Sequence, residues 1–267
     1  MCSGSGRSLA AATLLALAAL GACTVAGTRV ARAAEPAGYP SDPQLRVETG
    51  MHTGFIKKLS ASADGRRLLT VSDDKTARVW DAADGRLLQT LRVPIAPGTE
   101  GQLFAGVLTP DGRHALVGGF TGFEVKNGAV LYVFDAQSGQ LVGGIDRLPA
   151  HSIENLAFSV DGGVLAICQS DGGGVSVYDW RAKRFLVHDQ SPRAKILGAA
   201  FAPNGDLALT SEDGVLWLYE ASRQYQTPRH VELRAAASPM HVQYSADGRH
   251  LAVGFDAAPV IAILDAA

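Results

Sequence analysis

The stretch that decides the fold is residues 62–81, which read SADGRRLLTVSDDKTARVWD. It opens with a tight-turn signal, in which Asp64 provides a side-chain-to-backbone hydrogen bond and Gly65 the positive φ that a hairpin needs. An apolar run over 67–72 follows, then a second polar turn and a second apolar run that ends at Asp81. This order of short apolar runs and turns predicts antiparallel β-strands joined by hairpins.

The same turn occurs five times, with intervals of 47, 50, 43 and 43 residues between its Asp or Asn positions. The five turns are Ala63-Asp64-Gly65, Pro110-Asp111-Gly112, Val160-Asp161-Gly162, Pro203-Asn204-Gly205 and Ala246-Asp247-Gly248. Each repeat also closes a strand with a large residue followed by an acidic one, at Trp80-Asp81, Phe134-Asp135, Tyr178-Asp179, Tyr219-Glu220 and Leu264-Asp265. A period of this length is typical of propeller blades.

Each repeat is expected to form four short strands. In the first repeat, alternation and turn signals predict strands over 55–60, 67–72, 77–81 and 87–91. We therefore expect an all-β fold, a β-propeller of four-stranded antiparallel blades with five blades visible. The blades are predicted at about 50–93, 102–145, 150–188, 194–234 and 239–267. The loop over 118–127 is the main departure from the period.

The first repeat resembles the WD-repeat family of β-propellers, through His52, the turn at 62–65 and the closing Trp80-Asp81. The resemblance implies a structural hydrogen-bonded chain of His52, Ser72, Asp74 and Trp80. Weaker copies of this set are expected in the third and fourth repeats, at Ser170, Asp171, Tyr178, Ser211, Asp213 and Tyr219. The same trio of Ser, His and Asp would suit a catalytic triad, but the blade already accounts for it.

The ring is expected to close through the N-terminal segment. The last repeat reaches residue 267 directly after its third strand, and residues 44–49 are similar to the fourth strand of a blade. Pairing this segment with the last blade would hide its edge amides. The alternative is that the five repeats are a piece of a longer propeller, since members of the WD-repeat family commonly have seven blades.

The N-terminal region is predicted to direct export. Residues 8–27 hold no charge, are mostly Ala and Leu, and follow Arg7, which is typical of an export signal. The predicted organisation is an export or lipoprotein signal over 1–34, a linker over 35–43 and a propeller over 44–267. Ala31-Arg32-Ala33-Ala34 offers a signal-peptidase site, whereas Leu20-Gly21-Ala22-Cys23 resembles a bacterial lipoprotein box with lipidation at Cys23. An uncleaved membrane anchor is the third alternative.

We expect a periplasmic or extracellular protein, in contact with a membrane only through this signal or its lipid. The net charge of −2 becomes −5 if cleavage after Ala34 removes Arg7, Arg29 and Arg32. This balance argues against a nucleic-acid partner.

The sequence holds no recognisable catalytic or metal-binding motif. Cys168 lies in an apolar run and is expected to be a buried thiol. Glycosidases need two carboxylates, but Glu154 is the only one in the segments expected to face the channel. We therefore predict no enzymatic activity, no cofactor and no metal.

A rigid array of blades presents loops and a central pit, which suit recognition of a protein or peptide. The predicted partner-binding face comprises Phe55, Phe104, Phe120, Phe123, Lys126, Asn155, Lys195 and Met240. The favoured function is protein binding or scaffolding. The alternative is a central pocket that binds or processes a sugar or another small molecule.

Residues 45–53 and 91–95 also resemble a bacterial subset of exported WD-repeat proteins that accompany caspase-like peptidase domains. The segment Gln-Ala-Cys-x-Gly of such peptidases does not occur in the sequence, so that activity is not carried over. The resemblance implies a sensing or docking part alone.

Overall fold

The computed structural model describes residues 48–122, 128–233, 237–257 and 259–266. All described residues belong to one compact unit, Gly38–Ala267. The predicted signal, linker and lipidation site at Cys23 therefore lie outside the described residues, as do Phe123 and Lys126 of the predicted partner-binding face.

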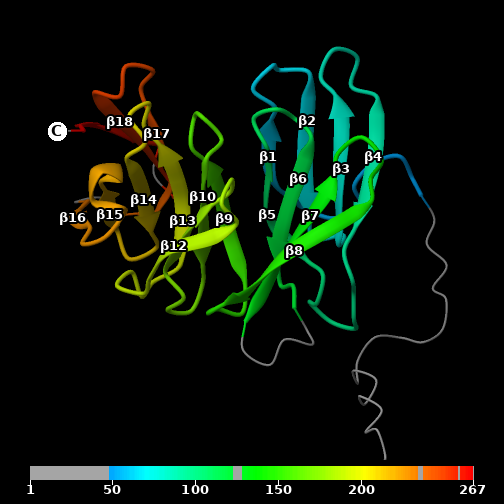
Figure 1. Ribbon diagram of the computed structural model, residues 1–267, viewed down its shortest axis with the longest axis horizontal. Coiled ribbons are helices and arrows are strands. Elements are labelled where there is room, and N and C mark those ends of the chain that lie inside the picture. Colours follow the sequence, from blue (N-terminus) through cyan, green and yellow to red (C-terminus); the bar gives the residue numbers. More distant parts are fainter. Residues whose placement is uncertain (1–47, 123–127, 234–236, 258, 267) are drawn as a thin grey trace, which may run out of the picture. The chain divides into compact units, whose positions relative to one another are not determined.

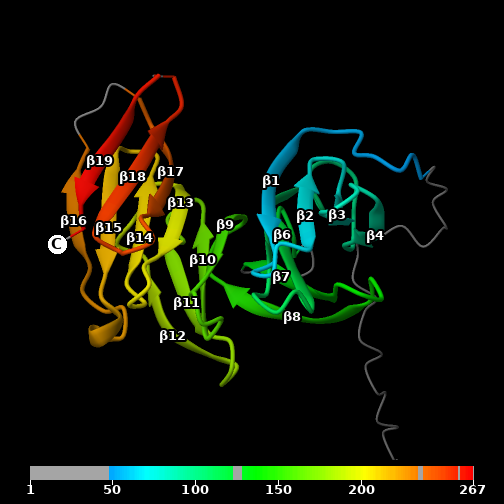
Figure 2. The ribbon, with the colours of Figure 1, turned by 90° about the horizontal axis from the view of Figure 1, so that it is seen from above.

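Five antiparallel sheets follow one another along the chain, and within each sheet every strand pairs with the next in sequence (Figures 1 and 2). The first sheet contains β1 (Ile56–Ala61), β2 (Arg67–Ser72), β3 (Thr76–Asp81) and β4 (Leu87–Arg92). The second contains β5 (Leu103–Leu108), β6 (His114–Gly119), β7 (Ala129–Asp135) and β8 (Leu141–Leu148). The third contains β9 (Ile153–Phe158), β10 (Val164–Gln169), β11 (Val175–Asp179) and β12 (Arg184–Asp189).

The fourth sheet contains β13 (Ile196–Phe201), β14 (Leu207–Ser211), β15 (Val215–Tyr219) and β16 (Arg229–Glu232), with the 3-10 helix η1 (Ala221–Arg223) before β16. The fifth contains β17 (Pro239–Tyr244), β18 (His250–Phe255) and β19 (Ile261–Asp265). The predicted all-β class and the five antiparallel sheets are confirmed. The fifth sheet has three strands in the described part of the chain. Of the segment over 44–49 that is predicted to supply its fourth strand, residues 44–47 lie outside the described part, and Glu48 and Thr49 belong to no strand.

Four apolar cores lie between successive sheets. The side chains of β6 show how one strand serves two of these cores. Ala115 and Val117 pack with the first sheet, and Leu116 between them packs with the third. Side chains alternate between the faces of a strand, so a sheet buried on both faces needs an uninterrupted apolar run.

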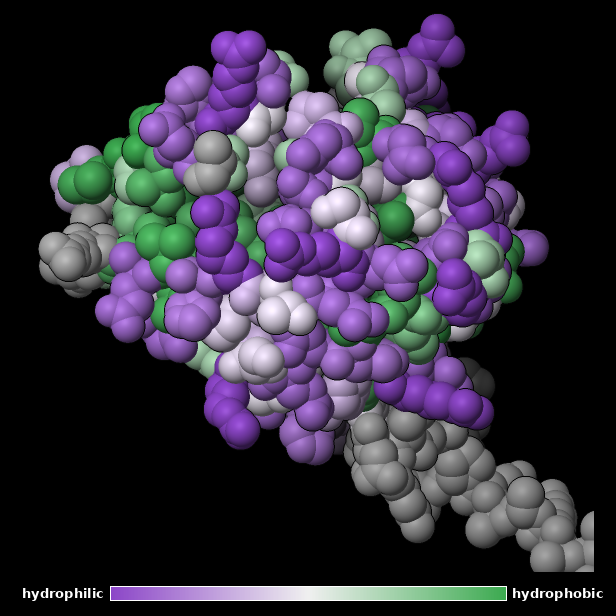
Figure 3. All heavy atoms as spheres, turned by 60° about the vertical axis from the view of Figure 1, so that its left-hand side comes forward, coloured by the Kyte–Doolittle hydropathy of each residue, from purple (hydrophilic) through white to green (hydrophobic). Residues whose placement is uncertain are grey.

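The first strands of neighbouring sheets also contact each other, β1 with β5, β5 with β9, β9 with β13 and β13 with β17. The outward faces of the first and fifth sheets differ from the inner ones. Leu59 in β1 is 61% exposed, and Ile261 and Ile263 in β19 are 68% and 64% exposed. Figure 3 shows an apolar area on the side that carries the later sheets. Within the described residues, both end sheets therefore present apolar groups to solvent.

The recurring turns share one hydrogen-bonding pattern in four of the five sheets. The Ser62 hydroxyl donates to Asp64 at 2.6 Å, and its oxygen accepts the Arg67 amide at 3.0 Å. The equivalent hydroxyl–carboxylate pairs, all at 2.6 Å, are Thr109–Asp111, Ser159–Asp161 and Ser245–Asp247. In the fourth sheet Ala202 replaces the hydroxyl residue, and the pattern is absent there.

We expect the protein to lose stability below about pH 4 through these turns. The hydroxyl hydrogen bond is the largest cause that lowers the pKa of Asp64, Asp111, Asp161 and Asp247. A carboxyl whose pKa is lower in the folded state stabilises above its unfolded pKa, and that contribution disappears as the pH falls through the folded pKa. Urea unfolding at pH 7 and pH 3 measures the loss. The double variant Asp64→Asn, Asp111→Asn should lose less on acidification, and an unchanged loss would contradict the assignment.

Candidate functional site

A hydrogen-bonded chain joins the loop before β1 to strands β2 and β3. The Trp80 indole N–H donates to the Thr70 hydroxyl oxygen at 2.8 Å. That oxygen lies 2.7 Å from Nε2 of His52, and Nδ1 of His52 lies 2.9 Å from Asp74 Oδ2. The side chains of His52 and Asp74 are 3% and 7% exposed. Three segments of the first sheet are therefore held together by one buried polar chain.

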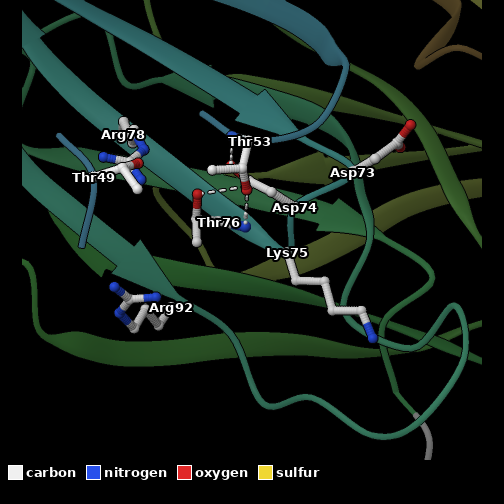
Figure 4. Close-up of a pocket in the computed structure, with 8 residues that line it drawn as sticks. All are labelled: Thr49, Thr53, Asp73, Asp74, Lys75, Thr76, Arg78 and Arg92. Atoms are coloured by element: carbon white, nitrogen blue, oxygen red, sulfur yellow. Dashed lines mark hydrogen bonds between the residues drawn. The ribbon is translucent and has the colours of Figure 1, made fainter. Parts of the chain in front are cut away.

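Asp74 ends this chain and collects further hydrogen bonds from Thr53 and Thr76 (Figure 4). Its carboxylate accepts the Thr53 amide at 2.9 Å, the Thr76 amide at 3.0 Å and the Thr76 hydroxyl at 2.6 Å. Burial alone would raise the pKa of Asp74, but the hydrogen bonds from Thr76, Thr53 and His52 outweigh burial and lower it. The ionised carboxylate is thus the form that the first sheet requires.

The chain runs through Thr70, not through Ser72 as the family resemblance implied. The Ser72 oxygen is buried and accepts the Asp74 amide at 3.1 Å. Residues 70 and 72 lie on the same face of β2, because they are two apart in a strand. Sequence alone could not decide which of these two hydroxyls meets the indole. Since His52 bonds Thr70 and Asp74, the arrangement also gives no support to a Ser72 nucleophile.

Thr70→Val should lower the free energy of unfolding by about 2 kcal/mol, because it leaves the Trp80 N–H and His52 Nε2 without their buried partner. Ser72→Ala is the matched control, and we expect about 1 kcal/mol from it because only one hydrogen bond is lost. Urea unfolding followed by tryptophan fluorescence compares the two. A larger loss for Ser72→Ala would place Ser72, not Thr70, in the chain.

The partial sets of the third and fourth sheets are assembled differently. Ser170 bonds Asp171 at 3.0 Å and also Ser152 at 2.7 Å. The ring of Tyr178 packs edge-on against Phe185, with centroids 5.1 Å apart. Tyr178 therefore serves the core rather than a polar chain.

In the fourth sheet, Ser211 donates to Asp213 at 2.5 Å and accepts the Trp217 indole N–H at 3.1 Å. Tyr219, the predicted aromatic member, instead donates to Asp189 at 2.9 Å. Burial is the largest cause that raises the pKa of Tyr219. Trp217 lies two residues before Tyr219 and nearer the turn, which explains why it reaches the hydroxyl.

Two arginines that the sequence analysis missed hold Glu48. Arg78 donates to one carboxylate oxygen at 2.7 Å and Arg92 to the other at 2.9 Å. The hydrogen bond from Arg78 is the largest cause that lowers the pKa of Glu48. The arginines and Asp74 line a cavity of about 350 Å³. Because Glu48 already binds both arginines, the two arginines anchor the segment that leads into the first sheet.

The first strand of every sheet contains a β-bulge at the same place. In β1, Ile56 pairs with Ser72 and Lys58 with Val71, so Lys57 is the extra residue. The equivalent extra residues in β5, β9, β13 and β17 are Phe104, Glu154, Leu197 and Met240. A bulge residue leaves the ladder, and its side chain is directed differently from those of its neighbours.

All five bulge residues line one cavity of about 610 Å³, together with Lys58, Leu59, Phe120, Lys195 and His241. The five sheets therefore contribute to a single hollow at their first strands. Its charged groups are three lysines and Glu154, and its walls are aromatic and aliphatic. This mixture of apolar walls and few polar groups is typical of binding sites.

The predicted partner-binding face is only partly assembled at this cavity. Phe104, Phe120, Lys195 and Met240 line it. Phe55 lies apart from the lining, is 80% exposed, and has the Lys57 ammonium 5.8 Å from its ring centroid. Asn155 is a correction, because its side chain is 4% exposed and donates to the Leu197 carbonyl at 2.7 Å. Asn155 directly follows the bulge residue Glu154 and is buried, so its role is structural.

The described residues hold no group of three or more His, Cys, Asp or Glu side chains placed to bind a metal ion. Burial raises the pKa of the Cys168 thiol to about 12, which keeps it protonated at neutral pH and unsuited to nucleophilic attack. Nor does the described part of the chain contain a helix long and apolar enough to cross a membrane.

Comparison with known proteins finds a likeness to WD repeats in the segment that carries β1, β2 and β3. Residues 45–81 match the family model described as WD domain, G-beta repeat. The chain is 38% identical over 76 residues to an uncharacterized WD repeat-containing protein, sll1491, of Synechocystis sp., a match that covers 28% of this chain and 20% of the relative. It is 54% identical over 41 residues to WD repeat-containing protein 86 of Homo sapiens, covering 15% of this chain and 11% of the relative. The chain thus spans a small part of the curated relatives it matches.

Proposed function

We propose that this chain is a non-catalytic propeller of the WD-repeat type that binds a protein or peptide partner. The observation that carries the proposal is the shared cavity, to which each of the five sheets contributes its bulge residue. WD repeats commonly mediate interactions between proteins, and the match at residues 45–81 supports that role here. Glu154 is the one carboxylate among the residues that line the cavity, whereas glycoside hydrolysis needs two.

The partner is proposed to be met outside the cytoplasm. The support is the sequence of residues 8–27, an uncharged stretch rich in Ala and Leu behind Arg7. The likeness to exported bacterial propellers that accompany caspase-like peptidases favours a docking role next to a separate enzyme. Mass spectrometry of the mature N-terminus tests this, since a lipidated Cys23 and a cleavage after Ala34 differ in mass. A cytoplasmic chain with its N-terminus intact would contradict export.

We also propose that the segment predicted over 44–49 adds a fourth strand to the fifth sheet through residues 44–47, since Glu48 and Thr49 belong to no strand. The exposed Ile261 and Ile263 on β19 support this, because an added strand would bring side chains next to them. Hydrogen exchange of the β19 amides, compared between chains that begin at residues 35 and 48, tests the pairing. Slow exchange only in the longer chain is expected. Equal exchange would favour the alternative of a longer propeller.

Affinity capture tests the main proposal. The chain from residue 35, immobilised and exposed to extract and medium of the producing organism, should retain a protein in stoichiometric amount. Phe104→Ala should reduce retention, since it removes a wall of the cavity. The second candidate function is binding of a sugar or small molecule, which the cavity of about 610 Å³ favours. A large thermal shift with one such compound, without any retained protein, would replace the first function by the second.

A further inference from the structure

Not every lysine that lines the cavity of about 610 Å³ is paired with a carboxylate of the chain. The Lys57 ammonium lies 3.1 Å from Asp73, and the Lys195 ammonium lies 3.7 Å from Glu154. Glu154 also accepts the Ser152 hydroxyl at 2.6 Å. Two of the three lysines are thus matched by carboxylates of the chain itself.

Lys58 is the exception. It follows the bulge residue of β1, is half-buried, and forms no hydrogen bond or ion pair with any residue in the described part of the chain. Burial lowers the pKa of this ammonium, and Glu154 acts on it only at longer range. Burial, and after it the nearby charge of Lys58, also lower the pKa of His241, which lines the same cavity. A half-buried cation of this kind gains from a ligand that brings a negative charge.

Apolar groups line the same cavity as this cation. Phe104 and Phe120 meet edge to face, with ring centroids 5.0 Å apart. Leu59, Leu197 and Met240 complete the apolar lining. A ligand must therefore offer apolar surface beside its charge, which a small hydrated anion lacks.

We propose that the cavity receives a peptide segment of the partner in which an Asp or Glu side chain lies next to a large apolar one. The carboxylate pairs with Lys58, and the apolar side chain packs on Phe104 and Phe120. This inference rests on the proposed function of protein binding. A nucleic acid is excluded by charge, because a polyphosphate needs a row of unmatched cations and the cavity supplies one.

Selection of random displayed peptides on the immobilised chain tests the proposal. Selected peptides should share Asp or Glu beside Leu, Ile or Phe. A synthetic copy of one of them should bind Lys58→Gln about tenfold more weakly than the unchanged chain, as expected for the loss of one partly desolvated charge pair. Lys183→Gln is the matched control, since Lys183 lies over the Trp180 ring in a hairpin of the third sheet and does not line the cavity. Binding to it should be unchanged.

A double-mutant cycle separates the charge pair from any disturbance of folding. The copy with Asn in place of Asp, or Gln in place of Glu, should bind the unchanged chain weakly. The neutral copy and the acidic copy should bind Lys58→Gln with similar affinity, because that variant no longer carries the charge with which the carboxylate pairs. Independent effects of the two changes would overturn the pairing.

The other outcomes distinguish this inference from the proposed function of protein binding, on which it rests. Enrichment of peptides without a carboxylate would overturn the inference and leave protein binding in place. Failure to enrich any peptide, with a thermal shift by glutarate alone, would overturn both and favour a small carboxylate ligand.

Discussion

Asp74→Ala should lower the free energy of unfolding by about 3 kcal/mol, because one side chain supplies the acceptor for four donors in a largely buried place. His52, Thr53 and Thr76 all lose their partner when this carboxylate is removed. The loop before β1 then loses the hydrogen bonds of His52 and Thr53 to the turn between β2 and β3, and keeps the one from the Asp73 amide to the Phe55 carbonyl at 3.1 Å. Urea unfolding followed by circular dichroism gives the free energy, and tryptophan fluorescence reports on Trp80 in the same sheet.

Asp213→Ala is the matched control for this prediction. Asp213 occupies the corresponding Ser-x-Asp motif of the fourth sheet, but among the described residues its carboxylate accepts a hydrogen bond from Ser211 alone. We expect a loss of about 1 kcal/mol from this variant. Equal losses for the two variants would show that the His52 network adds nothing to the strength of the first sheet.

Gly174→Ala should have the larger effect, a loss of about 4 kcal/mol or failure to fold. Gly174 has a φ of 61°, a left-handed conformation that side chains rarely adopt. A Cβ at this position would also overlap the backbone carbonyl of Asp189 at the end of β12. The backbone must shift to make room, and that shift would disturb the pairing of β11 with β12.

Gly172→Ala, two residues earlier in the same loop, separates the two causes. Gly172 also has a positive φ, of 78°, but a Cβ there would meet nothing within 4 Å. It should cost only about 1 kcal/mol, the cost of the left-handed conformation. Melting temperatures of the two variants provide the comparison. Similar melting temperatures would show that the backbone at Gly174 shifts to accommodate a Cβ at little cost in free energy.

The sequence predicted the strands well because each one lies between turns with a clear chemical signature. The pairs Asp64-Gly65 and Asp111-Gly112 lie at hairpins of the structure, and the apolar runs after them form β2 and β6. Their signals are local, so no knowledge of the tertiary structure was needed. The closing strand predicted over 44–49 depends on a long-range pairing, and it stays a prediction.

The site was harder to predict, because its members are chosen by geometry. Thr70 and Ser72 are both hydroxyl residues on one face of β2, and only their distance from Trp80 separates them. Trp217 and Tyr219 raise the same difficulty in β15. The pairing of Glu48 with Arg78 spans 30 residues and leaves no periodic signal. Lys58 was missed because its isolation depends on what surrounds it, not on its own type.

The bulge that recurs in β1, β5, β9, β13 and β17 has a consequence for how such an array evolves. The inserted residue makes no ladder pair, so a point mutation there alters the lining of the hollow while the sheet keeps its register. When a sheet is duplicated, the copy carries another bulge residue whose side chain lines the same cavity. Descendants of one ancestral repeat are therefore expected to diversify fastest at the positions of residues 57, 104, 154, 197 and 240, and to acquire new ligands one substitution at a time.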